Sequence, residues 1–149
     1  MRAITPAGAL ALVVALSQTL LVACAGDPDY VVQPGVIEFY DEQGPIVVPS
    51  TASVGSTFTV EVTTFGGGCE SFVNTAVAHV ADGAIVTPYD RSHIPGENEA
   101  CTDILHTFHH EAALSFDTAG SKIVRFHGRR HRGNVDEDIL LPYTIVVNE

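Results

Sequence analysis

Histidine is the residue type in this sequence with the clearest capacity for chemistry. Six of the seven histidines fall between His93 and His131. Imidazole nitrogen is a good ligand for zinc, copper and nickel ions. On a strand, His106 and His110 would share one face, and a turn near His109 would bring a third imidazole close to them. These residues suggest a metal site, with zinc or copper as the ion, built from His106, His109, His110, His127 and His131.

No established ligand spacing supports such a site. His110-Glu111 begins like the zinc-protease helix motif, but Leu114 stands where the second histidine is required, and the surrounding pattern is that of a strand. The competing interpretation is that the histidines are solvated, or packed at strand ends. A group of imidazoles that titrates near neutral pH would also suit a pH sensor. All three interpretations remain open at this point.

Arginine forms the one basic cluster of the sequence, at Arg125, Arg129, Arg130 and Arg132. This cluster could contact an anionic headgroup, a polyanionic glycan or an acidic partner. Acidic residues 136–138 follow closely, however, and pairing within the same loop would contribute little stability. The nucleophile sequence Gly-x-Ser-x-Gly is absent. The residues therefore favour a non-enzymatic protein, with a small hydrolase as a remote alternative.

The first residues have the pattern of a secretion signal. Arg2 precedes an apolar run from Ala7 to Ala23, which is too short and too interrupted for a membrane-spanning helix. The run ends in Leu21-Val22-Ala23-Cys24, which resembles the lipobox of bacterial lipoproteins. That resemblance, limited to the signal, implies cleavage before Cys24, acylation of this cysteine and anchorage in a lipid bilayer outside the cytoplasm. If the host is Gram-negative, Ala25 in place of aspartate favours the outer membrane.

The cysteine count agrees with lipidation. Three cysteines leave one unpaired, and acylation of Cys24 accounts for it. Cys69 and Cys101 then remain in a compartment where disulfides persist, and we predict that they pair. The alternative is two reduced, buried cysteines. Glycines 66–68 are expected to let the chain turn tightly into Cys69. The loop near residues 88–97, tied by the disulfide, is the expected binding surface, because loops on rigid scaffolds commonly carry function.

Charge and length limit the remaining possibilities. The chain has 18 acidic and 7 basic side chains, a net charge of −11 with histidine neutral. Such a surface argues against a nucleic-acid partner, because phosphate contacts need a basic face. The length after cleavage suits one domain. We expect a signal peptide at residues 1–23, the lipidated cysteine and a tether at 24–34, and a folded domain at 35–149.

Short runs of β-forming residues, separated by turn residues, fill the expected domain. The clearest is residues 56–64, where Phe58, Val60 and Val62 alternate with polar residues, as in a half-buried strand. Asp82-Gly83 predicts a hairpin, and a turn is expected near His109-His110. The runs are 36–40, 46–48, 56–64, 75–80, 84–89, 102–108, 111–116, 122–128 and 141–147.

About eight short strands without a helix predict an all-β fold, an immunoglobulin-like antiparallel β-sandwich. The tryptophan of true immunoglobulin domains is missing. The chain also resembles small uncharacterised bacterial lipoproteins, without a named family. We therefore expect a lipid-anchored binding or structural module of the bacterial envelope, without a cofactor and with an unknown protein or glycan ligand. The alternative is an envelope protein that binds zinc or copper through the histidines.

Overall fold

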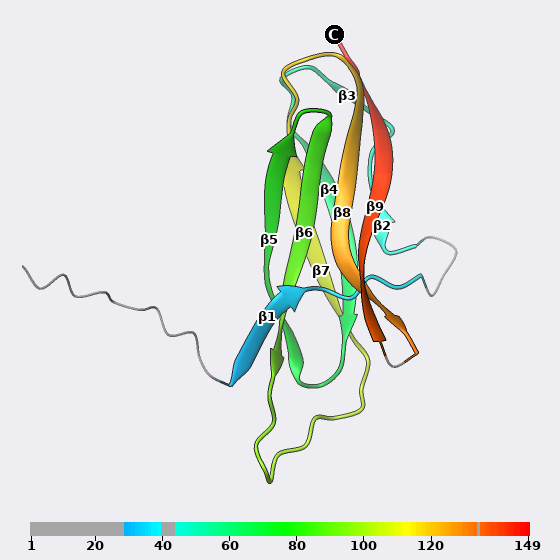
Figure 1. Ribbon diagram of the computed structural model, residues 1–149. Helices are drawn as coiled ribbons and strands as arrows, with labels where there is room; N and C mark the ends of the chain where they lie inside the picture. The colour runs from blue at the N-terminus through cyan, green and yellow to red at the C-terminus, as the bar shows by residue number, and fades with distance from the viewer. Residues whose placement is uncertain (1–28, 40–43, 134) are drawn as a thin grey trace, which may run out of the picture.

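The structure is a computed structural model that describes residues 29–39, 44–133 and 135–149 (Figure 1). The predicted signal peptide, Cys24 and the first part of the tether lie outside the described residues. Within those residues no helix is present, and so none that is long and apolar enough to cross a membrane. The strands are β1 (Tyr30–Pro34), β2 (Ile46–Val47), β3 (Thr51–Ser53), β4 (Phe58–Gly66), β5 (Glu70–Val80), β6 (Gly83–His93), β7 (His106–Leu114), β8 (Gly120–Arg132) and β9 (Val135–Asn148).

These strands form two sheets that pack face to face, so the predicted all-β sandwich is confirmed. The larger sheet has the order β1-β6-β8-β9-β3, and β5 pairs with the other edge of β6. The smaller sheet has the order β2-β4-β7. Most pairs are antiparallel, but β6 with β8 and β3 with β9 are parallel. The sandwich is therefore mainly antiparallel as expected, and the two parallel pairs make the larger sheet mixed.

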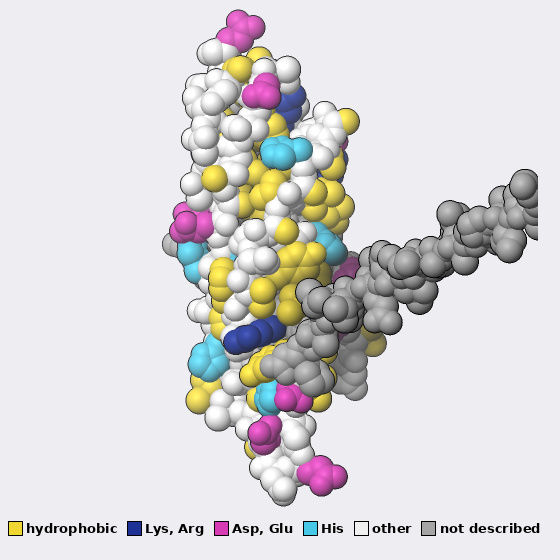
Figure 2. Space-filling view, turned by 90° about the vertical axis from the view of Figure 1, so that its left-hand side faces the viewer, with side chains coloured by type: hydrophobic (Ala, Val, Ile, Leu, Met, Phe, Trp, Pro, Cys, Tyr) yellow, Lys and Arg dark blue, Asp and Glu magenta, His cyan; other side chains and the backbone are white. Residues whose placement is uncertain are grey.

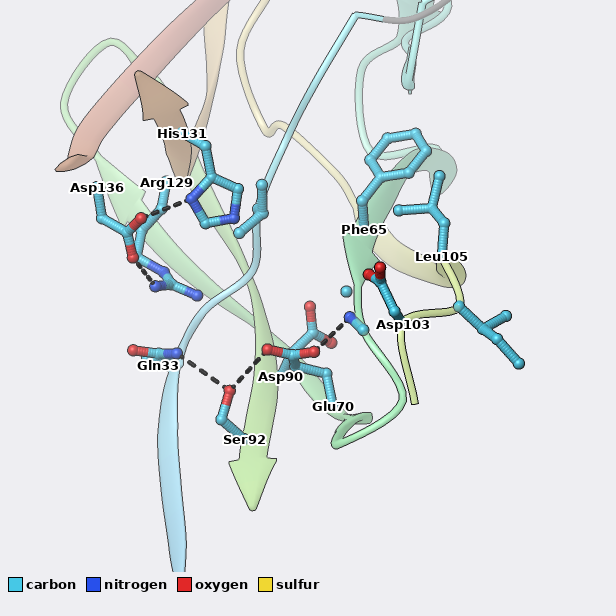
Figure 3. Close-up of a pocket in the computed structure, with 14 residues that line it drawn as sticks. Gln33, Phe65, Glu70, Asp90, Ser92, Asp103, Leu105, Arg129, His131 and Asp136 are labelled. Atoms are coloured by element: carbon cyan, nitrogen blue, oxygen red, sulfur yellow. Dashed lines mark hydrogen bonds and ion pairs between the residues drawn. The ribbon is translucent and has the colours of Figure 1, made fainter. Parts of the chain in front are cut away.

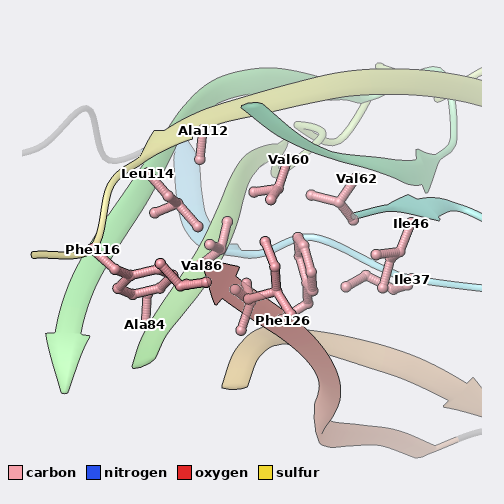
Figure 4. Packing of buried hydrophobic residues seen from close by; sticks show 13 residues of the cluster. Ile37, Ile46, Val60, Val62, Ala84, Val86, Ala112, Leu114, Phe116 and Phe126 are labelled. Atoms are coloured by element: carbon pink, nitrogen blue, oxygen red, sulfur yellow. The ribbon is translucent and has the colours of Figure 1, made fainter. Parts of the chain in front are cut away.

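The hydrophobic core lies between the two sheets (Figure 4). On β4, Val60 and Val62 are buried and alternate with more exposed residues, as the sequence pattern predicts. The same alternation buries Val124 and Phe126 on β8, and Ile145 and Val147 on β9. Burial of these side chains is the main stabilising contribution. The full cluster is Ile37, Ile46, Val60, Val62, Ala84, Val86, Ala112, Leu114, Phe116, Val124, Phe126, Ile145 and Val147.

The hairpin predicted at Asp82-Gly83 is confirmed. β5 and β6 pair from Val80 opposite Gly83, with two residues in the turn. A side chain at Gly83 would place its Cβ 1.9 Å from the carbonyl oxygen of Ile123. Glycine is therefore required because β8 approaches the turn closely.

Strand β1 differs from the expectation that residues 24–34 are a tether. Tyr30 to Pro34 pair with β6 from His93 back to Tyr89. This edge of β6 is open because β8 pairs only with the other half of the strand, residues 83–86. An open strand edge is a template for another strand, and the chain supplies that strand from its own N-terminal segment.

The strand expected at 36–40 is wrong in its described part. Val36 forms single bridges to Phe65 on β4 and to Arg129 on β8, which belong to different sheets. Arg129 also donates its backbone N–H to Gly35 and accepts one from Ile37. The segment thus crosses from one sheet to the other and cannot continue as a strand in either. Tyr40 lies outside the described residues.

Strand β7 corrects the turn expected near His109-His110. It runs without a break from His106 to Leu114, paired with every residue of β4 from Gly66 back to Phe58. The predicted strand 102–108 therefore begins only at His106. In the same way, β6 continues to His93. The loop expected near residues 88–97 therefore lies at residues 94–105 instead. Long partner strands extend these elements beyond what local propensity indicates.

Candidate functional site

The five candidate histidines lie apart in the fold. His106 is exposed at the start of β7, His110 is fully buried, and His109 points to the opposite face of the same strand. His127 and His131 belong to β8 in the other sheet. Among the described residues, no three of these imidazoles offer ligand atoms to one point. They therefore do not form one metal site.

His109 does meet two carboxylates on the outer face of the smaller sheet. Its Nε2 lies 3.7 Å from Glu61 Oε2 and 3.4 Å from Glu111 Oε1. Glu61 and Glu111 are directly opposite each other on β4 and β7. Like charges in this position repel, so a cation between them would relieve the repulsion. All three potential ligand atoms lie within 4.8 Å of one another.

His110 lies instead in a buried polar network that the sequence did not indicate. Its Nε2 is 3.0 Å from Asp90 Oδ1 and 3.2 Å from Thr64 Oγ1. The Thr64 hydroxyl donates to the other oxygen of Asp90 at 2.6 Å. His110 Nδ1 lies 3.3 Å from the hydroxyl of Thr75, and the ring packs on Phe72. Both ring nitrogens therefore have polar partners, Nε2 on the side of Asp90 and Thr64 and Nδ1 on the side of Thr75.

This network does not have the arrangement of a nucleophile triad. In such a triad one imidazole nitrogen contacts the hydroxyl and the other contacts the carboxylate. Here Nε2 contacts both Thr64 and Asp90, and the Thr64 proton goes to Asp90. Thr64 is also fully buried. The geometry therefore gives the hydrolase alternative no support at this position.

The arginine cluster pairs largely with nearby acids. Arg129 bonds to Asp136, and Arg132 lies 3.8 Å from Glu137. These two contacts match the expected pairing with the acids that follow in the sequence. Arg125 differs: both of its terminal nitrogens donate to Asp82, at 2.9 and 2.6 Å. That bidentate contact lowers the pKa of Asp82 below its ordinary value.

The predicted disulfide between Cys69 and Cys101 is confirmed, with 5.2 Å between the two Cα atoms. It joins the turn between β4 and β5 to the loop 94–105. Gly68 N–H also donates to the carbonyl oxygen of Thr102, and a Cβ at Gly68 would lie 1.8 Å from Thr102 Oγ1. The glycine before the cysteine is therefore needed for close contact between the two segments.

Further bonds hold the loop 94–105, which projects from one end of the sandwich (Figure 1). His93 Nε2 lies 2.8 Å from Glu99 Oε2, which also accepts the N–H of Gly96. The Glu99 contact raises the pKa of His93, and the imidazole in turn lowers the pKa of Glu99. Ile94 N–H donates to the carbonyl oxygen of Asp29. Acidic side chains gather at this end in the space-filling view (Figure 2).

A pocket of about 400 Å³ lies beside the disulfide-tied loop (Figure 3). It opens where β8 has separated from β6, since their pairing ends at Val86 opposite Phe126. Its volume is within the usual range for small-molecule sites. The lining residues are Gln33, Val36, Phe65, Gly66, Gly67, Glu70, Asp90, Ser92, Asp103, Ile104, Leu105, Arg129, His131 and Asp136.

Polar side chains in the pocket are held in defined positions. Gln33 donates to Ser92, whose hydroxyl donates to Glu70 at 3.1 Å. The other oxygen of Glu70 accepts the backbone N–H of Gly67. Figure 3 shows this chain of bonds on one wall and the group of Arg129, His131 and Asp136 on another. Of the five candidate histidines, only His131 lines this pocket.

The binding surface expected near residues 88–97 overlaps this pocket only at Asp90 and Ser92. Residues 103–105, which form one wall, belong to the disulfide-tied loop 94–105 but lie outside the expected range. In the structure Glu70 lies on β5, and Asp90 and Ser92 lie on β6. None of the three belongs to a ligand motif, so local sequence had no signal that their side chains meet. Comparisons with protein-family models, with curated proteins and with solved structures gave no match.

Proposed function

We propose that this chain is a lipid-anchored lipoprotein of the bacterial envelope, whose sandwich acts as a non-enzymatic binding module. The observation that carries the binding role is the pocket beside Cys69–Cys101, where several strands and a covalently tied loop converge. A site on rigid elements loses little conformational freedom when it binds. The immunoglobulin-like character of the sandwich belongs to this proposal, supported by the packing of its two sheets.

The location rests on the signal sequence. Leu21-Val22-Ala23-Cys24, behind an apolar run, supports cleavage and acylation at Cys24. Two or three acyl chains give a stable anchor, whereas one holds a protein only marginally. β1 begins at Tyr30, so only residues 25–29 separate the anchor from the sandwich. Five residues span at most about 18 Å, and this domain would work close to the membrane surface.

Replacement of the anchoring cysteine tests the location. Cys24→Ser is expected to abolish incorporation of labelled palmitate and to move the protein from the membrane to the soluble extracytoplasmic fraction, because no acceptor thiol remains. Ala25→Ser, beside it, keeps the thiol and should remain labelled and membrane-bound. Fractionation and palmitate labelling of both variants measure this. A Cys24→Ser protein that stays in the membrane fraction would contradict the anchor.

A second candidate function is zinc binding by Glu61, His109 and Glu111. Two ligand atoms at about 2.1 Å from a tetrahedral Zn²⁺ lie about 3.4 Å apart. The contacts from His109 Nε2 to the two carboxylates, at 3.4 and 3.7 Å, are close to that spacing. Imidazole and carboxylate are both accepted zinc ligands. This site keeps one histidine of the predicted cluster and adds two acids.

Calorimetry with the full chain and Zn²⁺ tests this candidate. His109→Ala is expected to weaken binding about tenfold or more, because it removes the one nitrogen ligand. His106→Ala is the matched control, since His106 lies on the same strand but outside the ligand group. Equal loss of affinity in both variants, or no binding by the unmodified chain, would rule the site out.

A further inference from the structure

We propose that the pocket beside the disulfide takes a small organic cation, an ammonium or guanidinium group on a short aliphatic arm. The inference rests on the proposed binding function and names the chemical class of its ligand. It follows from the charges that remain in the pocket once its internal pairs are formed, and from the apolar side chains next to them.

The positive charge of the pocket is already neutralised. Arg129 donates its Nε–H to the carbonyl oxygen of Pro34 at 2.7 Å and a terminal N–H to Asp136. His131 Nδ1 contacts the other oxygen of Asp136 at 2.6 Å. The charge of Arg129 is therefore balanced by Asp136.

Three other carboxylates in the pocket have no arginine or lysine partner among the described residues. Glu70 accepts bonds from a serine hydroxyl and a backbone N–H. Asp90, only 4% exposed, accepts a bond from Thr64 and lies 3.0 Å from His110 Nε2. Asp103 has no hydrogen bond or ion pair to any other described residue. A pocket with three carboxylates and no unpaired arginine or lysine among the described residues attracts positive charge.

Apolar side chains border these carboxylates. Ile104 and Leu105 are 57% and 63% exposed at the rim, and Val36 and Phe65 line the interior. An alkyl chain could cover the exposed aliphatic groups, and the burial of its methylene groups favours binding. The pocket therefore matches a ligand with one cationic end and a short apolar arm.

A bare metal ion fits this pocket less well. Among the described residues, the carboxylates of the pocket do not bring three ligand atoms within 4.8 Å of one another, whereas the group around His109 does. Carboxylates that are spread around a cavity suit an ammonium or guanidinium group, which donates hydrogen bonds in several directions. The acidic surface of the whole chain, at −11, would also raise the local concentration of cations.

Calorimetric titration of the full chain with n-butylammonium tests the inference. Two matched probes have a chain of the same length: 1-butanol is uncharged, and butyrate carries the opposite charge. Butylammonium is expected to bind, with an affinity that falls as salt is added. Asp103→Asn should weaken binding about tenfold or more and leave the thermal midpoint unchanged, because Asp103 has no partner in the described part of the chain. Asp117→Asn, an exposed acid outside the pocket lining, should bind like the unmodified chain.

Each outcome decides a separate point. If Nα-acetyl-lysinamide binds more tightly than butylammonium, the ligand is a lysine side chain of a protein. If butylammonium binds more tightly, the ligand is a free amine. Both results support the inference. If butanol or butyrate binds as well as butylammonium, or if both aspartate variants lose affinity equally, the cation inference fails while a binding role stands. If no probe binds, the cation inference fails, and the pocket no longer supports the binding role.

Discussion

Replacement of His110 by alanine is expected to lower the free energy of unfolding by about 3–5 kcal/mol. His110 is fully buried and bonds to Asp90, which is itself 4% exposed. Without the imidazole, one oxygen of a buried carboxylate loses its partner, and a cavity remains beside Thr64. Urea denaturation followed by circular dichroism measures the change.

His109→Ala is the matched control for this prediction. His109 is the next residue of the same strand, but its side chain is 55% exposed, so we expect a loss below about 0.5 kcal/mol. The double variant Asp90→Ala/His110→Ala should lose less than the sum of the two single variants, because it leaves neither partner unpaired. Equal losses for His109→Ala and His110→Ala would show that the buried network contributes nothing specific.

Removal of the disulfide has the second large expected effect. Cys69 and Cys101 are 32 residues apart, and the chain-entropy relation gives about 3–4 kcal/mol for a loop of this length. The double variant Cys69→Ser/Cys101→Ser, which leaves no new free thiol, should lose that amount in urea denaturation. It should also release residues 103–105, which form one wall of the pocket.

A reducing agent provides the control for the disulfide. It should destabilise the unmodified chain by the same amount and have no effect on the double serine variant. Hydrogen exchange at residues 102–105 should rise in the variant, because the loop then keeps only weaker contacts, such as the bond between Gly68 and Thr102. If the unmodified chain has the same stability in its oxidised and reduced forms, the stabilising role of the disulfide is contradicted.

Side-chain alternation was sufficient to predict the sandwich. Val60 and Val62 on β4, and Val124 and Phe126 on β8, are buried in the core as expected. A period of two follows from the geometry of the strand itself, so it can be read without knowing the partner strand. The hairpin at Asp82-Gly83 and the disulfide were also local or compositional signals, and both were confirmed.

Strand ends and strand pairing depended on partners distant in the sequence. The sequence predicts a tether where β1 forms, because β1 becomes a strand only by pairing with an open edge of β6, about 60 residues later in the chain. β7 continues through His109-His110 because β4 offers nine consecutive partners. Sheet pairing brings together residues that are remote in the chain, and a single sequence contains no direct record of it.

The same distinction between local signals and distant partners applies to the candidate site. Residue types alone determined that this chain is rich in acidic groups, carries Leu21-Val22-Ala23-Cys24 after an apolar run, and has two cysteines available to pair within the domain. Only the tertiary structure decided that His110 is buried against Asp90, that His109 faces two glutamates, and that Glu70, Asp90 and Asp103 line one pocket. The physical reason is that ligand geometry depends on which strands are neighbours, whereas composition and alternation are properties of the chain before it folds.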